Sequence, residues 1–166
     1  MLSTNNNSEL DAKSPIESDR RKKTALEIAL HFLKFRPRSS FEIERKLKQK
    51  KFSPEEIKKT LETLQKQGFL NDLEFAKLWI RNRNLLRPSG RKLLFLELRR
   101  LGVDSEICEK SLNEEDLPDM EKAKMILERK EKNLGKLSPD EFKEKMIGIL
   151  LRRGFSWDII KEVLKI

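Results

Sequence analysis

Few residues of this 166-residue chain are of the types that carry out catalysis. Its one histidine, His31, lies in an apolar helical stretch without a partner base, which favours partial packing on a helix over general-base chemistry. Its one cysteine, Cys108, precedes Leu112 by about one helical turn and has no histidine to activate it. A small buried thiol is therefore favoured over a nucleophile, and a single cysteine cannot form an intramolecular disulfide.

A group of five carboxylates is the third candidate for chemistry. It comprises Glu114, Glu115, Asp116, Asp119 and Glu121. Carboxylate oxygens could hold Mg²⁺ for phosphodiester hydrolysis. The pattern instead places them in a linker and in the first turn of the next helix, where negative charge suits solvent and the helix dipole. We therefore predict that the protein is not an enzyme, with no catalytic residue, metal or cofactor.

Basic side chains are concentrated in the middle of a chain whose net charge is +9. Residues 77–100 contain eight basic residues and one acid, whereas residues 102–121 contain one basic residue and eight acids. The eight are Lys77, Arg81, Arg83, Arg87, Arg91, Lys92, Arg99 and Arg100. Arginine suits two-point capture of phosphates and carboxylates. We predict that these residues form a surface that binds a protein partner, DNA or both.

Position within the helices separates some of these cations from others. Arg91 and Lys92 fall at the start of a predicted helix, where positive charge opposes the dipole, so we expect no structural role for them. A second basic cluster ends an earlier helix, where the dipole accounts for part of it. Its members are Arg45, Lys46, Lys48, Lys50 and Lys51.

The elements that must position these residues are all predicted to be helices. Five starts are marked by a Ser, Thr or Asn followed three residues later by Glu, the capping-box pattern. The pairs are Thr24 with Glu27, Ser39 with Glu42, Ser53 with Glu56, Asn71 with Glu74, and Ser138 with Glu141. Ser89, Asp104, Asp116 and Ser156 are expected to begin the other helices. Apolar spacing then predicts helices at about 24–35, 39–50, 53–67, 71–87, 89–101, 104–112, 117–134, 138–153 and 156–165.

An internal repeat groups these helices in threes. Shifts of 51 or 52 residues align Pro37 with Pro88 and Pro139, and also align Leu47, Leu98 and Leu150. The predicted fold is all-α, with three tandem three-helix units at 20–70, 71–115 and 116–166 after a disordered tail at 1–19. Each unit is expected to bury a face against its neighbour. Gly102 and Gly154 take the left-handed position of the turn before each third helix, and Lys51 in the first copy predicts a strained or different turn.

The run from Ala25 to Leu112 resembles the RecX family of regulators of the RecA recombinase. The residues that carry the resemblance include Arg36-Pro37-Arg38-Ser39, Phe75-Ala76, Arg81-x-Arg83, Glu97-Leu98 and Gly102-Val103. Two positions depart from the family pattern: Asn71-Asp72 replaces an acidic pair, and Lys51 replaces a glycine.

The resemblance implies a curved, elongated, helix-turn-helix-like array that acts without catalysis. It further implies binding to the RecA filament on single-stranded DNA and inhibition of strand exchange, ATP hydrolysis and co-protease function. This places the protein in DNA repair, DNA recombination and the SOS response. We expect the protein itself to be a monomer. Weak, non-specific binding to DNA alone is expected from the phosphate-directed charge.

Two other functions stay open from the residues alone. A helix-turn-helix-like regulator of duplex DNA is the main alternative, although the third helices begin with acids, such as Glu55 and Glu106, that would meet phosphates. A general helical scaffold is the other. The chain lacks an apolar run of about 20 residues and an N-terminal signal core, so we expect a cytoplasmic protein without membrane contact.

Overall fold

A computed structural model describes residues 23–134 and 137–166, and the predicted tail lies outside this range. In the described ranges the chain is helical, without strands, which confirms the all-α prediction. The helices are α1 (Ala25–Leu33), α2 (Ser40–Gln49), α3 (Pro54–Lys66), α4 (Asp72–Leu86), α5 (Arg91–Arg100), α6 (Ser105–Glu115), α7 (Asp119–Leu134), α8 (Pro139–Arg152) and α9 (Trp157–Leu164).

Local capping chemistry sets most of the helix starts. Thr24, Ser39, Ser53 and Ser138 form complete capping boxes with the glutamate three residues on, as predicted. Asn71 caps α4 by accepting from the amides of Leu73 and Glu74. The cap of α4 therefore survives the departure from the family pattern.

Two predicted helix starts are wrong. The residue before α5 is Gly90, which offers no side-chain cap, while the Ser89 hydroxyl donates to the Arg87 carbonyl. Asp116 does not begin α7 but ends α6, and its carboxylate accepts from the Lys122 ammonium instead. Serine and aspartate side chains can bind other local groups instead of capping a helix, and Ser89 and Asp116 do so here.

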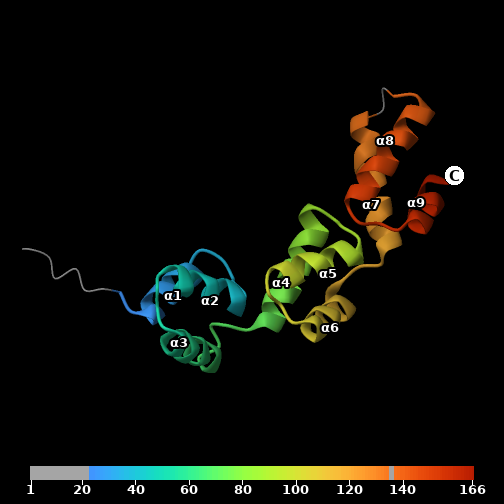
Figure 1. The fold of residues 1–166 in the computed structure, drawn as a ribbon. Helices are drawn as coiled ribbons and strands as arrows, with labels where there is room; N and C mark the ends of the chain where they lie inside the picture. The colour runs from blue at the N-terminus through green and yellow to red at the C-terminus, as the bar shows by residue number, and fades with distance from the viewer. Residues whose placement is uncertain (1–22, 135–136) are drawn as a thin grey trace, which may run out of the picture.

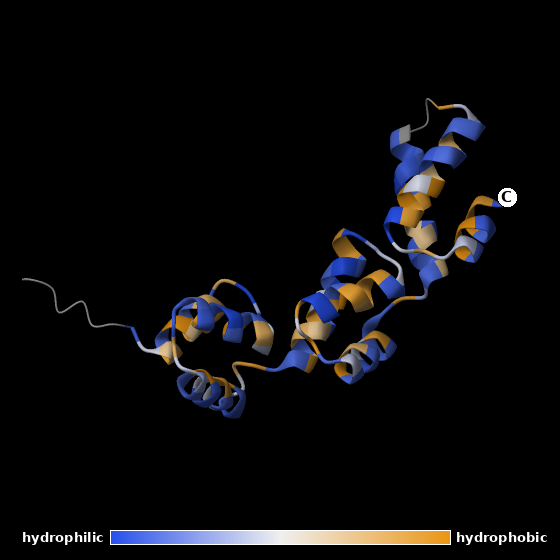
Figure 2. Cartoon of the chain, viewed as in Figure 1, coloured by the Kyte–Doolittle hydropathy of each residue, from blue (hydrophilic) through white to orange (hydrophobic). Residues whose placement is uncertain are grey.

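Three consecutive units, α1–α3, α4–α6 and α7–α9, follow one another in an elongated, bent row (Figure 1). Each unit has its own hydrophobic cluster, centred on Leu47, Leu98 or Leu150. The buried apolar residues of each unit come from all three of its helices, whose ribbons carry both apolar and polar positions (Figure 2). The expectation that neighbouring units share a buried face is therefore wrong: the cores are separate, and the units meet at narrow joints.

Both joints are built in the same way, from the start of the second helix of one unit and the next unit. In the first joint the Ser39 hydroxyl donates to the Leu101 carbonyl at 2.5 Å, and the Ser40 amide donates to Asp72 at 2.7 Å. In the second joint the Gly90 amide donates to the Arg153 carbonyl at 2.8 Å, and the Arg91 amide donates to Asp119 at 2.9 Å. Asp72 and Asp119 thus each cap a helix of the preceding unit, where a helix N-terminus favours a carboxylate.

The turn glycines have a second role at these joints. A β-carbon on Gly102 would collide with the Phe41 side chain, and one on Gly154 would lie 2.7 Å from the Leu93 β-carbon. Lys51 holds the same turn in a left-handed conformation (φ 64°), so the predicted strain is present. Among the described residues no unit precedes the first one to contact this turn, so a side chain fits there.

Candidate binding surface

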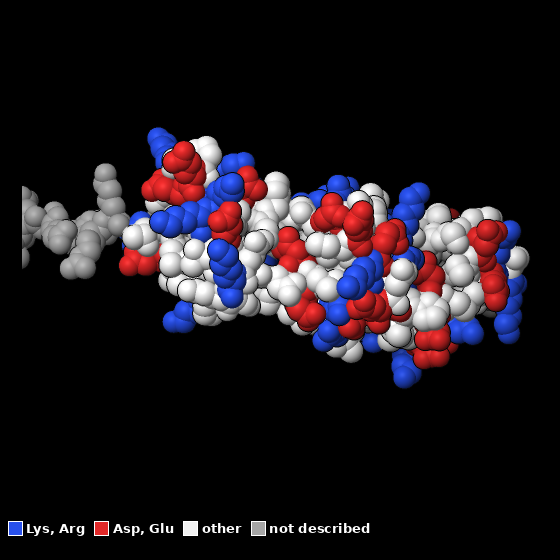
Figure 3. Space-filling view, turned by 90° about the horizontal axis from the view of Figure 1, so that it is seen from below, with Lys and Arg blue, Asp and Glu red and all other residues white. Residues whose placement is uncertain are grey.

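The acidic helix α6 packs along the basic helix α4. Acidic side chains of α6 therefore form ion pairs with basic side chains of α4. Lys77 pairs with Glu114 at 2.7 Å, and Arg81 donates two hydrogen bonds of 2.8 and 3.1 Å to Glu115. The ion pair raises the pKa of Lys77 and lowers that of Glu114. On the face drawn in Figure 3, basic and acidic side chains are interspersed over the middle unit.

The positions of these acids correct one sequence-based prediction. Glu114 and Glu115 lie in the last turn of α6, not in a linker. Their cationic partners outweigh the unfavourable helix dipole at that end.

Two more of the eight predicted residues have defined partners. Arg83 forms a two-point ion pair with Glu97, which also accepts from the Trp79 indole at 3.2 Å. Arg91 donates to Glu109 and to Asn113, each at 2.7 Å. The expectation that Arg91 lacks a structural role is therefore wrong.

The other four predicted residues are exposed, and three have no side-chain partner among the described residues. These three are Arg87, Lys92 and Arg100, while Arg99 donates to the Val103 carbonyl at 2.7 Å. Helical spacing puts Lys92 and Arg99 on one face of α5, together with the exposed Leu96 and opposite the buried Leu94 and Leu98. The structure thus leaves the outer face of α5, rather than α4, with uncompensated positive charge.

Two arginines that the sequence analysis missed extend this charge across the second joint. Arg129 donates to the Leu85 carbonyl at 3.5 Å and Arg153 to the Pro88 carbonyl at 3.1 Å, on either side of Arg87. Burial, and then the charges of Arg87, Arg83 and Arg129, lower the pKa of Arg153. Both lie in the third unit, more than 40 residues from their acceptors, so only the repeat register could have suggested their position.

Two of the remaining carboxylates, Asp116 and Asp119, have a structural partner. Lys122 is fully buried, and its ammonium lies 2.9 Å from both Asp116 and Asp119. Among the described residues, no three His, Cys, Asp or Glu side chains are grouped as a metal site would require. Cys108 is buried, as predicted, and burial is the main cause that raises its pKa to about 11.

Two aromatic side chains differ from the simplest core placement. His31 is exposed and meets Phe35 edge to face, with 5.1 Å between ring centroids. Trp79 packs on the core of the middle unit, whereas Trp157 is 49% exposed.

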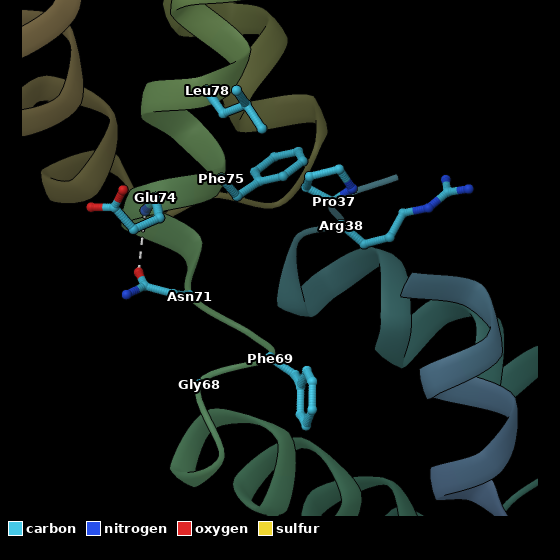
Figure 4. Close-up of a pocket in the computed structure, with 8 residues that line it drawn as sticks. All are labelled: Pro37, Arg38, Gly68, Phe69, Asn71, Glu74, Phe75 and Leu78. Carbon is cyan, nitrogen blue, oxygen red and sulfur yellow. Dashed lines mark hydrogen bonds between the residues drawn. The ribbon is translucent and has the colours of Figure 1, made fainter. Parts of the chain in front are cut away.

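A small apolar pocket opens at the first joint (Figure 4). Pro37 from the first unit lies beside Phe75 from α4, and Phe69 stands opposite them on the connection between the units. The polar side chains in its lining are those of Arg38, Asn71 and Glu74. This pocket belongs to the joint between the first two units.

These features define a class: an elongated repeat protein that presents exposed cations and has a separate core in each unit. Three family models match it in order: the first three-helix domain of RecX over residues 25–64, the second over 71–112 and the third over 118–164. The chain belongs to the RecX family.

Curated relatives and solved structures agree with this assignment. The chain is 32% identical to the regulatory protein RecX of Amycolatopsis mediterranei, over 89% of this chain and 87% of the relative. It is 38% identical to the regulatory protein RecX of Prosthecochloris aestuarii, over 89% and 95%. A crystal structure of RecX from Lactobacillus salivarius aligns with a TM-score of 0.71 and 26% identity, over 85% of this chain and 92% of that one. These likenesses support a RecX-type regulatory role.

Proposed function

We propose that this protein binds the RecA filament on single-stranded DNA and inhibits strand exchange, ATP hydrolysis and co-protease function. The observation that carries the proposal is the match of all three units to RecX domains in their proper order. The proposed role is regulatory and non-enzymatic, in the cytoplasm. None of the helices in the described part of the chain has the length and apolar character needed to cross a bilayer.

The contact surface in this proposal is the outer face of α5 together with the arginines at the second joint. Arg87, Lys92 and Arg100 are the members of the predicted set whose side chains need break neither an ion pair nor a hydrogen bond with another described residue to bind a partner. Arginine and lysine here suit carboxylates of the recombinase or phosphates of the DNA. Lys77, Arg81 and Arg91 would contribute mainly by holding α6 against α4 and α5, and Arg83 by joining α4 to α5.

An elongated array of separately folded units fits such a partner. Its charges are spread along a row rather than gathered at one cleft, so binding along a repeating filament would engage several weak contacts at once. Linked weak contacts give high overall affinity without any single strong one. DNA alone would then be held weakly and in a strongly salt-dependent way.

The test is RecA's DNA-dependent ATP hydrolysis with the purified full-length protein added. We expect the triple variant Arg87→Glu, Lys92→Glu and Arg100→Glu to lose inhibition at least tenfold, with melting nearly unchanged because exposed charges alter stability little. Lys124→Glu, Lys132→Glu and Lys145→Glu make the same charge change on exposed residues of the third unit and should inhibit normally.

Two results would contradict the proposal. If the wild-type protein left RecA turnover unchanged, the regulatory target would be another protein. If the triple variant inhibited fully, the assigned surface would be wrong. Tight, site-selective binding to duplex DNA at physiological salt would favour the helix-turn-helix alternative instead.

A further inference from the structure

A separate pocket of about 490 Å³ lies in the first unit, away from the surface assigned above. Ile28 and Phe32 of α1 contribute apolar lining, and Phe35 adds an aromatic wall that is 70% exposed and braced by His31. The volume lies within the range of about 300–1,000 Å³ typical of ligand pockets. An aromatic side chain this exposed contributes little to the core of its own unit.

The rest of the lining is cationic. It consists of Lys23, Arg38, Lys46 and Lys50, and it includes no carboxylate. Arg38 is held by the buried Glu42 and stacks 3.8 Å above the Phe32 ring, and the Lys46 ammonium lies 5.3 Å from the same ring. The three lysines form no ion pair with any described residue.

The helix dipole explains only part of this arrangement. Lys46 and Lys50 end α2, where cations are favoured, and they share one helical face. The dipole gives no reason for an exposed phenylalanine to stand beside them. Apolar surface beside several cations, in a lining without a carboxylate, matches a ligand that is both apolar and acidic.

We propose that this pocket binds an acidic peptide segment of a partner protein through one aromatic or branched aliphatic side chain. The apolar side chain would enter between Phe32 and Phe35. Carboxylates on either side of it would meet Lys23, Lys46 and Lys50. The site is distinct from the α5 surface and does not depend on the function proposed above.

A single-stranded nucleic acid fits the pocket less well. Such strands are held by successive bases that stack on open aromatic faces. Arg38 and Lys46 both lie over the Phe32 ring, and the His31 ring meets Phe35 edge to face. What is left is one short, partly open aromatic wall beside a pocket, which suits one side chain better than a run of bases.

Fluorescence anisotropy with the full-length protein tests this site without RecA. The probe is a labelled peptide with one Phe flanked on each side by three acidic residues. We expect saturable binding that weakens at least tenfold when the Phe of the peptide is replaced by Ala. The variants Lys46→Glu with Lys50→Glu, and separately Phe35→Ala, should weaken binding by a similar factor.

The matched control is Lys58→Glu with Lys59→Glu, an equal charge change on the exposed part of α3 in the same unit, which should bind normally. Circular dichroism of each variant verifies folding. Equal binding of the Phe and Ala peptides would reduce the site to general charge attraction and overturn the proposal. A labelled 12-nucleotide oligo(dT) that bound more tightly than the peptide, with the same dependence on Phe35, would reassign the pocket to nucleic acid.

Discussion

Individual side chains in this protein are defined by their partners more than by their type. Lys122 is a lysine at full burial, and it is tolerated because Asp116 and Asp119 both contact its ammonium. Asp119 also caps the preceding unit's α5 through the Arg91 amide. One carboxylate therefore helps to satisfy a buried charge and a helix end at once, which costs less than leaving either unpaired.

Cys108 gives a residue-scale prediction. Burial raises its pKa to about 11, so almost none of it is thiolate at pH 8, and thiolate is the reactive form. In the unfolded chain, with a pKa near 9.0, the reactive fraction is about a hundredfold larger. We expect alkylation of the native protein by iodoacetamide at pH 8 to be at least a hundredfold slower than in 6 M guanidinium chloride. Equal rates would mean that Cys108 is accessible in the native protein.

At the scale of elements, local sequence signals predicted the helices well, but they did not predict the long-range contacts between helices. Ser53 and Ser138 cap helices through atoms three residues away, so the sequence carries the whole interaction. The pairing of Arg81 with Glu115 spans 34 residues, and a run of like charge gives no sign of which helix will cover it. Four of the eight predicted binding residues therefore serve the unit's own packing, and the binding role of the set stays a prediction.

The three equivalent turns give an element-scale prediction. Gly102→Ala adds a β-carbon that meets Phe41 at a left-handed position, so we expect a loss of at least about 1–2 kcal/mol of stability from backbone conformation alone. Lys51→Gly relieves the same strain without meeting another unit, and should change stability by between zero and about +1 kcal/mol once the entropy of glycine is included. Urea denaturation followed by circular dichroism measures both.

A control variant separates the cost of the backbone conformation at Gly102 from the cost of the contact with Phe41. A third variant, Gly68→Ala, adds a β-carbon at another positive φ with no atom nearby. It should lower the free energy of unfolding only by the cost of the left-handed backbone conformation. If Gly102→Ala cost no more than Gly68→Ala, contact between the units at this turn would not constrain the glycine.

At the scale of the whole molecule, the separation of the cores decides how the chain behaves. Each unit buries its own apolar cluster, while few residues join one unit to the next. We expect each unit of such a row to stay folded when a joint is weakened. The angle between units then depends on a few hydrogen bonds and side-chain contacts, so we expect binding to change the shape of the molecule at the joints.

Asp72 and Asp119 test this picture, because each joins two units without belonging to a hydrophobic core. Asp119 also pairs with Lys122, so Asp72 is the cleaner site. Asp72→Ala removes the carboxylate that accepts from the Ser40 amide, leaving that helix N-terminus to water, a loss of about 0.5–2 kcal/mol for a cap. We expect helical content to be unchanged while small-angle X-ray scattering shows a larger radius of gyration and a broader distribution of interatomic distances. Asp72→Asn retains an oxygen acceptor and should restore most of the compactness.

Asp104→Ala, which removes a cap within the middle unit, serves as the matched control and should leave the scattering profile unchanged. If Asp72→Ala scattered like the wild type, the Ser39–Leu101 hydrogen bond and the Phe41–Gly102 contact would be sufficient to fix the first joint, and the angle between units would not depend on the shared helix cap.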